Sequence, residues 1–526
     1  MSSTSRSRLH VVVGIPGTGI RLALQRLSLR HPNDVVLLSL EEVLEEFAQP
    51  SLKKLQDLPA SPIAKFALPR SFLKQVWKDA FRVQWKKAQA ALRHGKHVIL
   101  TFHLCYYNHR TREYLTPANF QTLRDAFGRH RPTFITLIDD IYDCCRRLCA
   151  SEGMFPLPQD GEEALLDAFT VLDWRSMEML LADAVALTCG SKHYLIGVKH
   201  PVSTLEELLF SNKKVAYLSH PISEPRRMWT DARVDKSHVH KIVDEIQSFS
   251  ERLSQKYIVI QPTTIDEFRF RYLSAQLGDR WPFQDQGTEE LLYHPPGALK
   301  NDQLFPAGWN QDLRDQAQDS PVLKRLKAAI FEQIGARDHY LVDQADIVVA
   351  YRPLYRGNDS SGVQEELLHH AILRDSEPRR QTAIVYSPEQ DRKAYPARQL
   401  WETVIPGWRD AEILTGGNAD LDSLIRDLQT GTPAERDAVL KGESGALKAL
   451  LHRYGISIAP TIKWKGAMGR SAQLRSLSQA DFLAAQVAQF QQNYLDELAK
   501  RHSARVYATI RRFEEALGLR STGGKA

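Results

Sequence analysis

The sequence predicts an α/β protein with two doubly wound parallel-sheet domains followed by a helical C-terminal region. The chain has 526 residues, which is too long for one ordinary hydrophobic core. Short apolar runs alternate with helical segments, and this order builds a parallel sheet with helices on both of its faces. The alternation starts a second time near residue 213 and gives way to helical patterning near residue 418. We therefore predict domains at residues 1–212, 213–417 and 418–526.

The first domain has a regular alternation of apolar and amphipathic segments. The apolar runs predict strands at His10–Val13, Asp34–Leu38, His97–Phe102, Thr133–Ile138 and His193–Val198. The segments between them predict helices at Ile20–Leu29, Arg70–Arg93, Pro117–Phe127 and Gly161–Ala186.

The second domain repeats the architecture without a detectable sequence repeat. Its predicted strands are Lys214–Leu218, Tyr257–Gln261, Asp346–Tyr351 and Thr382–Tyr386. Its predicted helices are Ser237–Gln255, Pro321–Ile334 and Val363–Leu373. An insert at about residues 266–320 interrupts it, and inserts of that length are usually functional or disordered. Trp281-Pro282-Phe283 within the insert predicts an aromatic anchor or lid, or local packing of a long loop.

The composition is that of a soluble globular protein, with 43% apolar and 25% charged residues. No apolar run reaches the length of a membrane span, and the first eight residues lack the apolar core of a secretory signal. We therefore expect a cytoplasmic protein that does not contact a membrane. The net charge of +6 permits contact with nucleic acid or nucleotides but does not require it.

The five cysteines predict packed thiols and no metal site. Three of them lie within Cys144–Cys149, but no second cluster of Cys or His stands at zinc spacing. In a reducing compartment such residues behave as small buried side chains.

The segment after the first predicted strand, GIPGTGIR, resembles a phosphate-binding loop. In such loops successive backbone N–H groups and the start of the next helix bind phosphate, while a Lys and a Ser or Thr serve the phosphates and magnesium. The glycine frame consists of Gly14, Pro16, Gly17 and Gly19. Ile20 and Arg21 stand in place of the lysine and the hydroxyl, and Arg21 reaches a phosphate only if it turns back along the helix.

Further parts of the first domain strengthen this resemblance. Asp139 and Asp140 follow the strand Thr133–Ile138, where a magnesium-binding acid would stand, and Arg146 and Arg147 lie on the next helical segment. Over residues 9–198 the order of parts resembles adenylate-kinase-like P-loop kinases. The resemblance implies a bound nucleotide, with or without magnesium, at Gly14, Pro16, Gly17, Gly19, Arg21, Asp139, Asp140, Arg146 and Arg147. The missing lysine and hydroxyl argue against phosphoryl transfer.

Two structural interpretations of these residues stay open. A glycine turn without any ligand joins a strand to a helix equally well. Asp139 and Asp140 also fit a helix N-cap and a first-turn acid.

Three motifs of the second domain resemble nucleoside 2-deoxyribosyltransferase-like domains. Val215–Ser223 (VAYLSHPIS) fits a first strand and loop with Tyr-Leu-small-x-Pro, and Arg337–Ala350 fits an acid-bearing helix that leads into a strand opened by Ala-Asp. Ser360–Leu367 (SSGVQEEL) fits the pattern Ser-Gly-Thr-x-x-Glu. Leu368-His369-His370 then replaces the Gly-Tyr-Ala of that family, so we expect a different base pocket.

The second resemblance implies chemistry at an N-glycosidic bond. Glu366 is the expected nucleophile, which forms a glycosyl–enzyme intermediate and requires no cofactor. Asp338 and Asp346 are the expected partners of sugar hydroxyls. The other expected substrate-binding residues are Tyr217, Ser219, Pro221, Arg352, Tyr355, Arg356, Ser361 and Gly362, with the arginines on a phosphate and Tyr351 or Tyr355 on a base.

The functional hypothesis is therefore an enzyme that cleaves or transfers an N-glycosidic bond of a nucleoside, a nucleotide or an NAD-like substrate. The first domain would bind a nucleotide or regulate. Glu366 also fits an ordinary first-turn acid of a helix. A nucleotide kinase or NTPase whose loop is rescued by another cation, and a catalytically silent nucleotide-sensing scaffold, are the alternatives.

The C-terminal region is basic and amphipathic. Its basic residues are Lys463, Lys465, Arg470, Arg475, Arg501, Arg505, Arg511 and Arg512, interleaved with Trp464 and Tyr507. A solvated helical face is favoured over contact with nucleic acid. Its apolar stripe, which includes Phe482, Phe490 and Leu498, predicts either docking onto the other domains or self-association, and we expect a homo-oligomer.

Overall fold

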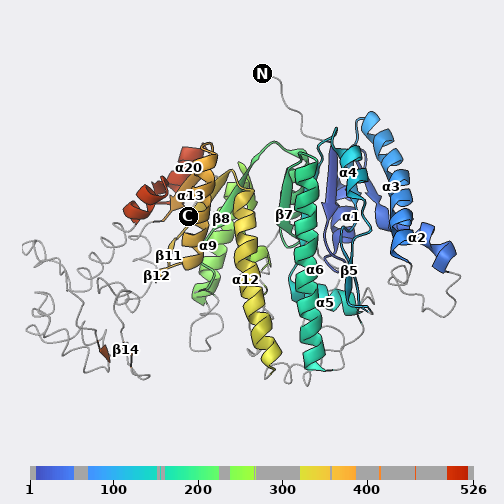
Figure 1. Ribbon diagram of the computed structural model, residues 1–526. Helices are drawn as coiled ribbons and strands as arrows, with labels where there is room; N and C mark the ends of the chain where they lie inside the picture. Colours follow the sequence, from blue (N-terminus) through green and yellow to red (C-terminus); the bar gives the residue numbers. More distant parts are fainter. Residues whose placement is uncertain are drawn as a thin grey trace, which may run out of the picture. The chain divides into compact units, whose positions relative to one another are not determined.

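The computed structural model (Figure 1) describes most of the first two predicted domains and part of the C-terminal region. The described residues are 8–52, 69–109, 111–150, 155, 160–223, 225, 237–265, 267, 320–355, 358–386, 414–415, 456–457 and 495–518. The chain divides into two compact units: residues 1–218 with 227–346, and residues 219–226 with 347–526.

The first sheet lies in the first unit, and its described strands pair in parallel throughout. Its order is β2-β3-β1-β6-β7. The strands are β1 (Leu9–Val13), β2 (Val35–Ser39), β3 (His97–Thr101), β6 (Thr133–Ile138) and β7 (His193–Gly197). β1 is central, pairing with β3 through Leu9 and Val98 and with β6 through His10 and Thr133. Because the chain leaves β1 and β6 toward opposite edges, their carboxyl ends flank a switch point, where open α/β sheets bind ligands.

The first unit also contains helices, of which α1 to α6 lie between strands of the first sheet, whereas α7, α9 and α12 follow that sheet in the chain. They are α1 (Ile20–Arg30), α2 (Leu40–Leu52), α3 (Arg70–Arg93), α4 (Phe120–Phe127), α5 (Ile141–Ala150), α6 (Gly161–Thr188), α7 (Val202–Phe210), α9 (Ser237–Ser254) and α12 (Pro321–Asp343). Side-chain caps fix the starts of several: Asp160 accepts a hydrogen bond from the Glu163 N–H at 2.7 Å, and Ser320 accepts one from the Val322 N–H at 3.2 Å. A hairpin of β4 (Tyr106–Asn108) and β5 (Glu113–Leu115), which the alternation did not predict, follows β3.

Two hydrophobic clusters hold the first unit together. One packs α2 and α3 on the sheet through large side chains such as Trp77, Phe81 and Phe134. The other joins α5, α6 and α12 through residues such as Leu148, Leu172 and Leu326. Figure 1 shows α6 and α12 as long helices, and the second cluster places them in contact.

The second sheet has the order β16-β13-β10-β8-β9. Its strands are β8 (Lys214–Ser219), β9 (Tyr257–Ile260), β10 (Ile347–Tyr351), β13 (Gln381–Val385) and β16 (Arg505–Tyr507). Numbered along the chain this is the order 2-1-3-4-5 of a doubly wound sheet, whose ligands bind where the first and third strands end. Ser219 ends the first of these strands and Tyr351 ends the third.

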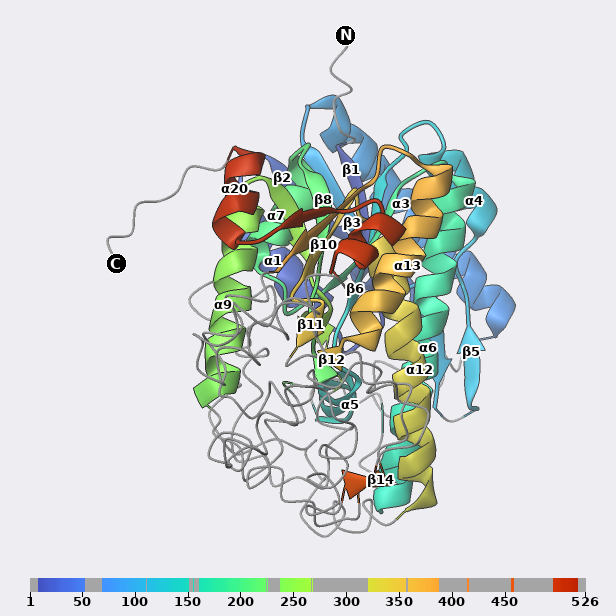
Figure 2. The ribbon, with the colours of Figure 1, turned by 90° about the vertical axis from the view of Figure 1, so that its left-hand side faces the viewer.

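Other elements of the second unit surround its strands. α13 (Ser361–Ser376) connects β10 to β13, and α20 (Ile510–Leu517) follows β16 (Figure 2). Short paired segments are β11 (Leu354–Tyr355) with β12 (Asn358–Asp359), and β14 (Leu414–Thr415) with β15 (Ile456–Ser457).

The predicted fold class is confirmed, since two parallel five-stranded sheets are flanked by helices. Within residues 418–526, which were expected to be helical, Arg505–Tyr507 instead pairs with β13 as β16. The Trp281–Phe283 motif and most of residues 418–494 lie outside the described residues. In the part of the chain that the structure describes, no helix is both long and apolar enough to span a membrane.

Candidate functional site

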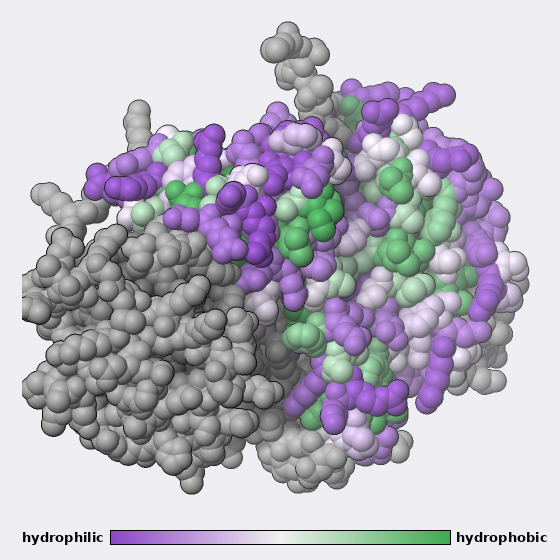
Figure 3. Space-filling model, turned by 60° about the vertical axis from the view of Figure 1, so that its left-hand side comes forward, coloured by the Kyte–Doolittle hydropathy of each residue, from purple (hydrophilic) through white to green (hydrophobic). Residues whose placement is uncertain are grey.

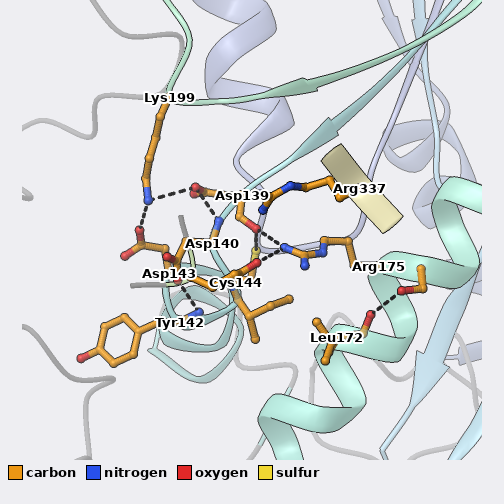
Figure 4. A network of polar contacts seen from close by, with 12 residues as sticks. Asp139, Asp140, Tyr142, Asp143, Cys144, Leu172, Arg175, Lys199 and Arg337 are labelled. Carbon is orange, nitrogen blue, oxygen red and sulfur yellow. Dashed lines mark hydrogen bonds and ion pairs between the residues drawn. The ribbon is translucent and has the colours of Figure 1, made fainter. Parts of the chain in front are cut away.

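A buried charge network occupies the carboxyl ends of β6 and β7 in the first unit (Figure 4). Asp139, directly after β6, forms an ion pair with Arg147 of α5 and lies 3.4 Å from Nζ of Lys199. Lys199, two residues after β7, also pairs with Asp143 at 2.8 Å. Figure 4 shows Lys199 pointing toward Asp139 and Asp143. The Asp139 side chain is only 1% exposed, so these two cations replace the water that would otherwise solvate it.

Glu267 extends this network. Its carboxylate is fully buried, forms an ion pair with Arg175 of α6 and accepts a hydrogen bond from the Ile141 N–H at 2.7 Å. Arg175 also donates to the backbone oxygen of Asp139 at 2.9 Å. Burial acts to lower the pKa of Arg337 on α12, but the charges of Asp338 and Glu267 raise it overall. Glu267 therefore joins the start of α5 to cations from two other helices.

The glycine-rich loop that was predicted to bind phosphate is covered by α5. Gly17 has a φ of 84°, and a Cβ built on it would lie 2.9 Å from Cγ of Leu148. Nε of Arg147 donates to the backbone oxygen of Gly17, and residues 14–18 are buried. A phosphate at this loop would have to displace α5, and Arg147 would have to leave Asp139.

A second buried carboxylate, Glu178 of α6, ties the loops after β1 and β3 together. It accepts hydrogen bonds from the N–H groups of Leu104 at 2.9 Å and Cys105 at 2.6 Å, and from that of Gly14. Nδ1 of His103 contacts the backbone oxygen of Gly14. Burial raises the pKa of Glu178 to about 8, although the backbone donors act to lower it. The first amide of the glycine loop is thus occupied by the chain's own carboxylate.

The remaining residues of the predicted nucleotide site have different environments. Oδ1 of Asp140 accepts from the Tyr142 N–H at 2.8 Å, which is the helix-cap contact that the structural interpretation expects. Gly19 precedes α1 with a φ of 87°, and Arg21 is exposed in the first turn of that helix. Pro16 is buried, and Arg146 lies on α5, where only its backbone is described. The structure thus brings Gly17, Asp139 and Arg147 together, and Arg21 is not part of their network.

The surroundings of Asp139 do not fit a magnesium ion. The Asp139 oxygens contact Arg147, Lys199 and the Asp140 N–H, so a cation would have to displace two positive charges. Among the described residues, no group of three or more His, Cys, Asp or Glu side chains is arranged to hold a metal.

In the second unit, two of the motifs meet in one contact. Oγ of Ser219, at the end of β8, donates a hydrogen bond to Oε2 of Glu366 on α13, 147 residues later. Both are buried, with Ser219 0% and Glu366 6% exposed. Ser360 begins α13 by accepting from the Val363 N–H at 3.5 Å. Glu366 therefore lies within the first two turns of that helix, whose positive end favours a carboxylate.

Arg352 lies directly after β10, also in the second unit. Its φ of 50° is in the left-handed region that residues other than glycine rarely adopt. Its N–H donates to the backbone oxygen of Val385 at 3.1 Å, and its guanidinium carbon lies 5.7 Å from the ring centroid of Tyr351. Backbone strain of this kind clusters at functional sites. Ser219 and Arg352 thus end neighbouring strands of the second sheet.

The other predicted substrate-binding residues are partly described. Tyr217 and Pro221 are buried, and Ser361 and Gly362 are exposed at the start of α13. A Cβ on Gly362 would meet nothing within 4 Å, so the described fold leaves open space beside this residue. Tyr355 is described by its backbone alone, in β11, and Arg356 lies outside the described residues.

Asp338 and Asp346 make contacts elsewhere. Asp338 pairs with Arg337 at 2.9 Å on α12. Oδ2 of Asp346 accepts from the Val215 N–H at 2.9 Å, and the Asp346 N–H donates to the Val215 oxygen at 2.8 Å. This two-way contact gives Asp346 a structural role at the amino end of β10, whereas Arg352 follows the carboxyl end.

Sequence reasoning missed Lys199, Arg175 and Glu267 of the charge network, and it also missed Glu178, which binds the loops after β1 and β3. Lys199 carried a usable signal, because it directly follows the predicted strand His193–Val198 and so belongs at the same sheet edge as Asp139. The other three carried none, since each acts through a partner at least 36 residues away in the chain.

The two sites differ in their chemistry. The first consists of buried charges that neutralise one another within the chain. The second is a buried carboxylate that accepts a hydrogen bond from a hydroxyl group beside a strand end, and a carboxylate in this position can attack an electrophilic carbon. Neither models of known protein families nor sequences of curated proteins match this chain.

Proposed function

We propose that this protein is an enzyme that cleaves or transfers an N-glycosidic bond of a nucleoside, a nucleotide or an NAD-like compound. The contact between Ser219 and Glu366 carries the proposal, because it joins two motifs 147 residues apart at one sheet edge. Ligands of doubly wound sheets bind beyond the carboxyl ends of the strands, and Ser219 ends β8.

Glu366 acts as the nucleophile in the proposed reaction. One of its carboxylate oxygens attacks the anomeric carbon, the bond from that carbon to the base nitrogen breaks, and the base leaves with the electron pair and takes up a proton. Water or a second base then attacks the same carbon, and the bond to Glu366 breaks. An oxocarbenium-like transition state is stabilised by a carboxylate in this position.

Ser219 positions the nucleophile. Its hydroxyl donates a hydrogen bond to Oε2 of Glu366 and so holds the carboxylate in one orientation for the attack. Arg352 ends the neighbouring strand and is the proposed partner of a substrate phosphate. Open space beside Gly362 supports a ligand at the start of α13.

The test is to incubate the full chain with deoxynucleosides, nucleotides or NAD and to measure by chromatography the free base that is released. We expect release by the wild type and none by Glu366→Gln. Glu365→Gln is the matched control, because Glu365 is the exposed neighbour on the same helix and should keep full activity. Absence of release by the wild type, or equal release by Glu366→Gln, would rule the proposal out.

A second candidate function, nucleotide binding by the first unit with or without turnover, is favoured by one observation. Lys199 supplies a cation at the carboxyl end of β7, which the glycine loop itself lacks, and its side chain is 15% exposed. In this candidate Lys199 leaves Asp139 and Asp143 for a phosphate. Thermal stabilisation by ATP or GTP should then be lost in Lys199→Met, and a wild type that no nucleotide stabilises would exclude this function.

A further inference from the structure

Helix α3 concentrates much of the positive charge of this protein. Of its 24 residues seven are basic and one is acidic, so α3 alone has the formal net charge of +6 that the whole chain has. A stripe of basic residues on one helix is the electrostatic signature of a surface that binds a polyanion. The basic residues of α3 are Arg70, Lys74, Lys78, Arg82, Lys86, Lys87 and Arg93.

Five of these residues form a line along the exposed side of α3, here called the cationic row. Lys74, Lys78, Arg82 and Lys86 follow one another at steps of four residues, and Arg93 extends the line toward the end of the helix. Steps of four residues keep side chains next to one another, about 6 Å apart along the axis. All five residues are exposed, and the row is about 28 Å long.

The chain neutralises little of the charge of this row. Asp79, the acid of α3, pairs with Arg82 at 3.0 Å. The other four side chains of the cationic row form no ion pair or hydrogen bond within the part of the chain that the structure describes. Arg70 is different, because it pairs with Glu113 at 2.9 Å and lies outside the row.

The turn after α4 adds two cations beside the row. Trp85 follows Lys78 by seven residues, so it lies on the same side of α3, and its ring centroid is 5.4 Å from that of His130. Arg129 and Arg131 flank His130 in the sequence, and both are exposed. The cationic row together with these two arginines is called the basic face below.

Acids near α3 leave the basic face positive. Asp125 of α4 is exposed and accepts a hydrogen bond within its own helix at 2.7 Å. α2 carries Glu42, Glu45 and Glu46, and in Figure 1 this helix lies on the side of α3 away from α4. The basic face therefore has seven cations beside two acids, Asp79 and Asp125.

The basic face offers charge without apolar anchors. The described surface in Figure 3 includes both hydrophilic and apolar areas, but large apolar side chains of α3 such as Leu73, Trp77 and Phe81 are buried in the core. Phe72 is 37% exposed and precedes Lys74 by two residues, so it lies more than half a turn away from it. A membrane-bound helix needs an apolar side, and a protein interface needs aromatic or aliphatic anchors, so neither partner fits this face.

A nucleic-acid duplex does fit the basic face. Duplex DNA carries one negative charge per about 1.7 Å of its axis, and cationic side chains that meet its phosphates release condensed counterions. At about 3.4 Å per base pair, the cationic row spans about 8 base pairs. Single strands are held instead by bases that stack on free aromatic rings. The ring of Trp85 already stacks on Phe81 and contacts Phe127, so the face favours a duplex.

We propose that the basic face binds the phosphate backbone of a nucleic-acid duplex without reading its sequence. Contacts to phosphates position a protein on a duplex but carry no sequence information. This inference is independent of the proposed reaction, since the residues of the basic face belong neither to the Ser219–Glu366 contact nor to the charge network around Asp139.

The first test is the fluorescence anisotropy of a labelled DNA duplex of about 20 base pairs, titrated with the full chain between about 50 and 200 mM salt. The wild type should bind. The logarithm of its association constant should fall against the logarithm of the salt concentration with a slope of about −4 to −6, because each phosphate contact contributes about −0.9. Lys78→Ala with Lys86→Ala should weaken binding at least about tenfold and make the slope shallower by about 2.

The matched control is Lys241→Ala with Lys324→Ala, which removes the same charge from exposed positions on α9 and α12. It should bind the duplex within about threefold of the wild type. Circular dichroism should be the same for all three proteins. A wild type that does not bind the duplex at the lowest salt concentration, or a control that loses as much affinity as the Lys78 and Lys86 variant, would overturn the proposal.

The second test separates the duplex from other polyanions. Unlabelled duplex should displace the labelled duplex at least about tenfold more effectively than a single strand of the same length. Vesicles of phosphatidylcholine and phosphatidylserine should displace it no better than the single strand does, because the basic face has no apolar side to insert. Equal or stronger displacement by the single strand or by the vesicles would overturn the assignment of a duplex.

Discussion

The hydroxyl of Ser219 donates a hydrogen bond to the buried carboxylate of Glu366, and this contact joins the end of β8 to α13. Removing a hydrogen bond to a charged group costs about 1.5–3 kcal/mol. We therefore expect Ser219→Ala to slow base release by about 10- to 100-fold, and Glu366→Gln to slow it by at least about 10³-fold. Steady-state rates on the best substrate measure both effects. Ser219→Ala and Glu366→Gln with equal rates would contradict a positioning role for Ser219.

Replacing Asp139 should lower the stability of the first unit strongly. Asp139→Ala would leave Arg147 buried without its carboxylate and remove a partner of Lys199. Loss of one member of a buried ion pair typically lowers the free energy of unfolding by about 3–5 kcal/mol. Urea denaturation measures this loss. The control is Asp79→Ala, whose exposed partner Arg82 predicts a change below about 1 kcal/mol.

The buried side chain of His200 should make the free energy of unfolding depend on pH. Nδ1 contacts the Gly197 oxygen at 3.1 Å, and Nε2 accepts from the Gln261 N–H at 3.3 Å, so both ring nitrogens suit a neutral imidazole. Burial lowers the pKa of His200 to about 4. Its contribution to stability is therefore complete above pH 6.5 and is lost as the pH falls toward 4.

This contribution amounts to about 3 kcal/mol. His200→Gln keeps one donor and one acceptor but cannot gain a proton. The unfolding free energy of the wild type should therefore fall relative to that of the variant as the pH decreases from 6.5 to 4. Parallel pH profiles for the two proteins, measured by urea denaturation, would disprove the assignment.

Replacement by alanine should have opposite effects on stability at Gly17 and at Gly362. At Gly17 a Cβ would press on Leu148, and the φ of 84° disfavours any other residue. Gly17→Ala should therefore destabilise the first unit by at least about 1 kcal/mol. Gly362 lies in a helix with open space around it, so Gly362→Ala should stabilise by up to about 1 kcal/mol. Thermal melts of both variants check this, and destabilisation of equal size at both positions would contradict it.

The parts of the fold that follow from local pattern could be predicted from the sequence. Apolar runs identified β1 and β6, and the motifs of the second domain that resemble a known family placed Ser219 and Glu366 in one predicted site, where the structure joins them by a hydrogen bond. The closure of the glycine loop could not be predicted, because it depends on Leu148 packing against Gly17 across 131 residues of chain. The role of Glu178 could not be predicted either, since a single acid in a helix does not indicate that three distant backbone N–H groups will donate to it.

β16 has a consequence for how the chain is made. Residues 505–507 pair with β13, which ends at Val385, so about 120 residues are synthesised between the two partners. Until β16 emerges, β13 remains an edge strand with unpaired backbone groups, and such edges recruit other chains. The first unit can complete its own sheet by Gly197, long before that point. During synthesis the interval between Val385 and Arg505 is therefore when the nascent protein is most exposed to aggregation, and when a chaperone would protect it most.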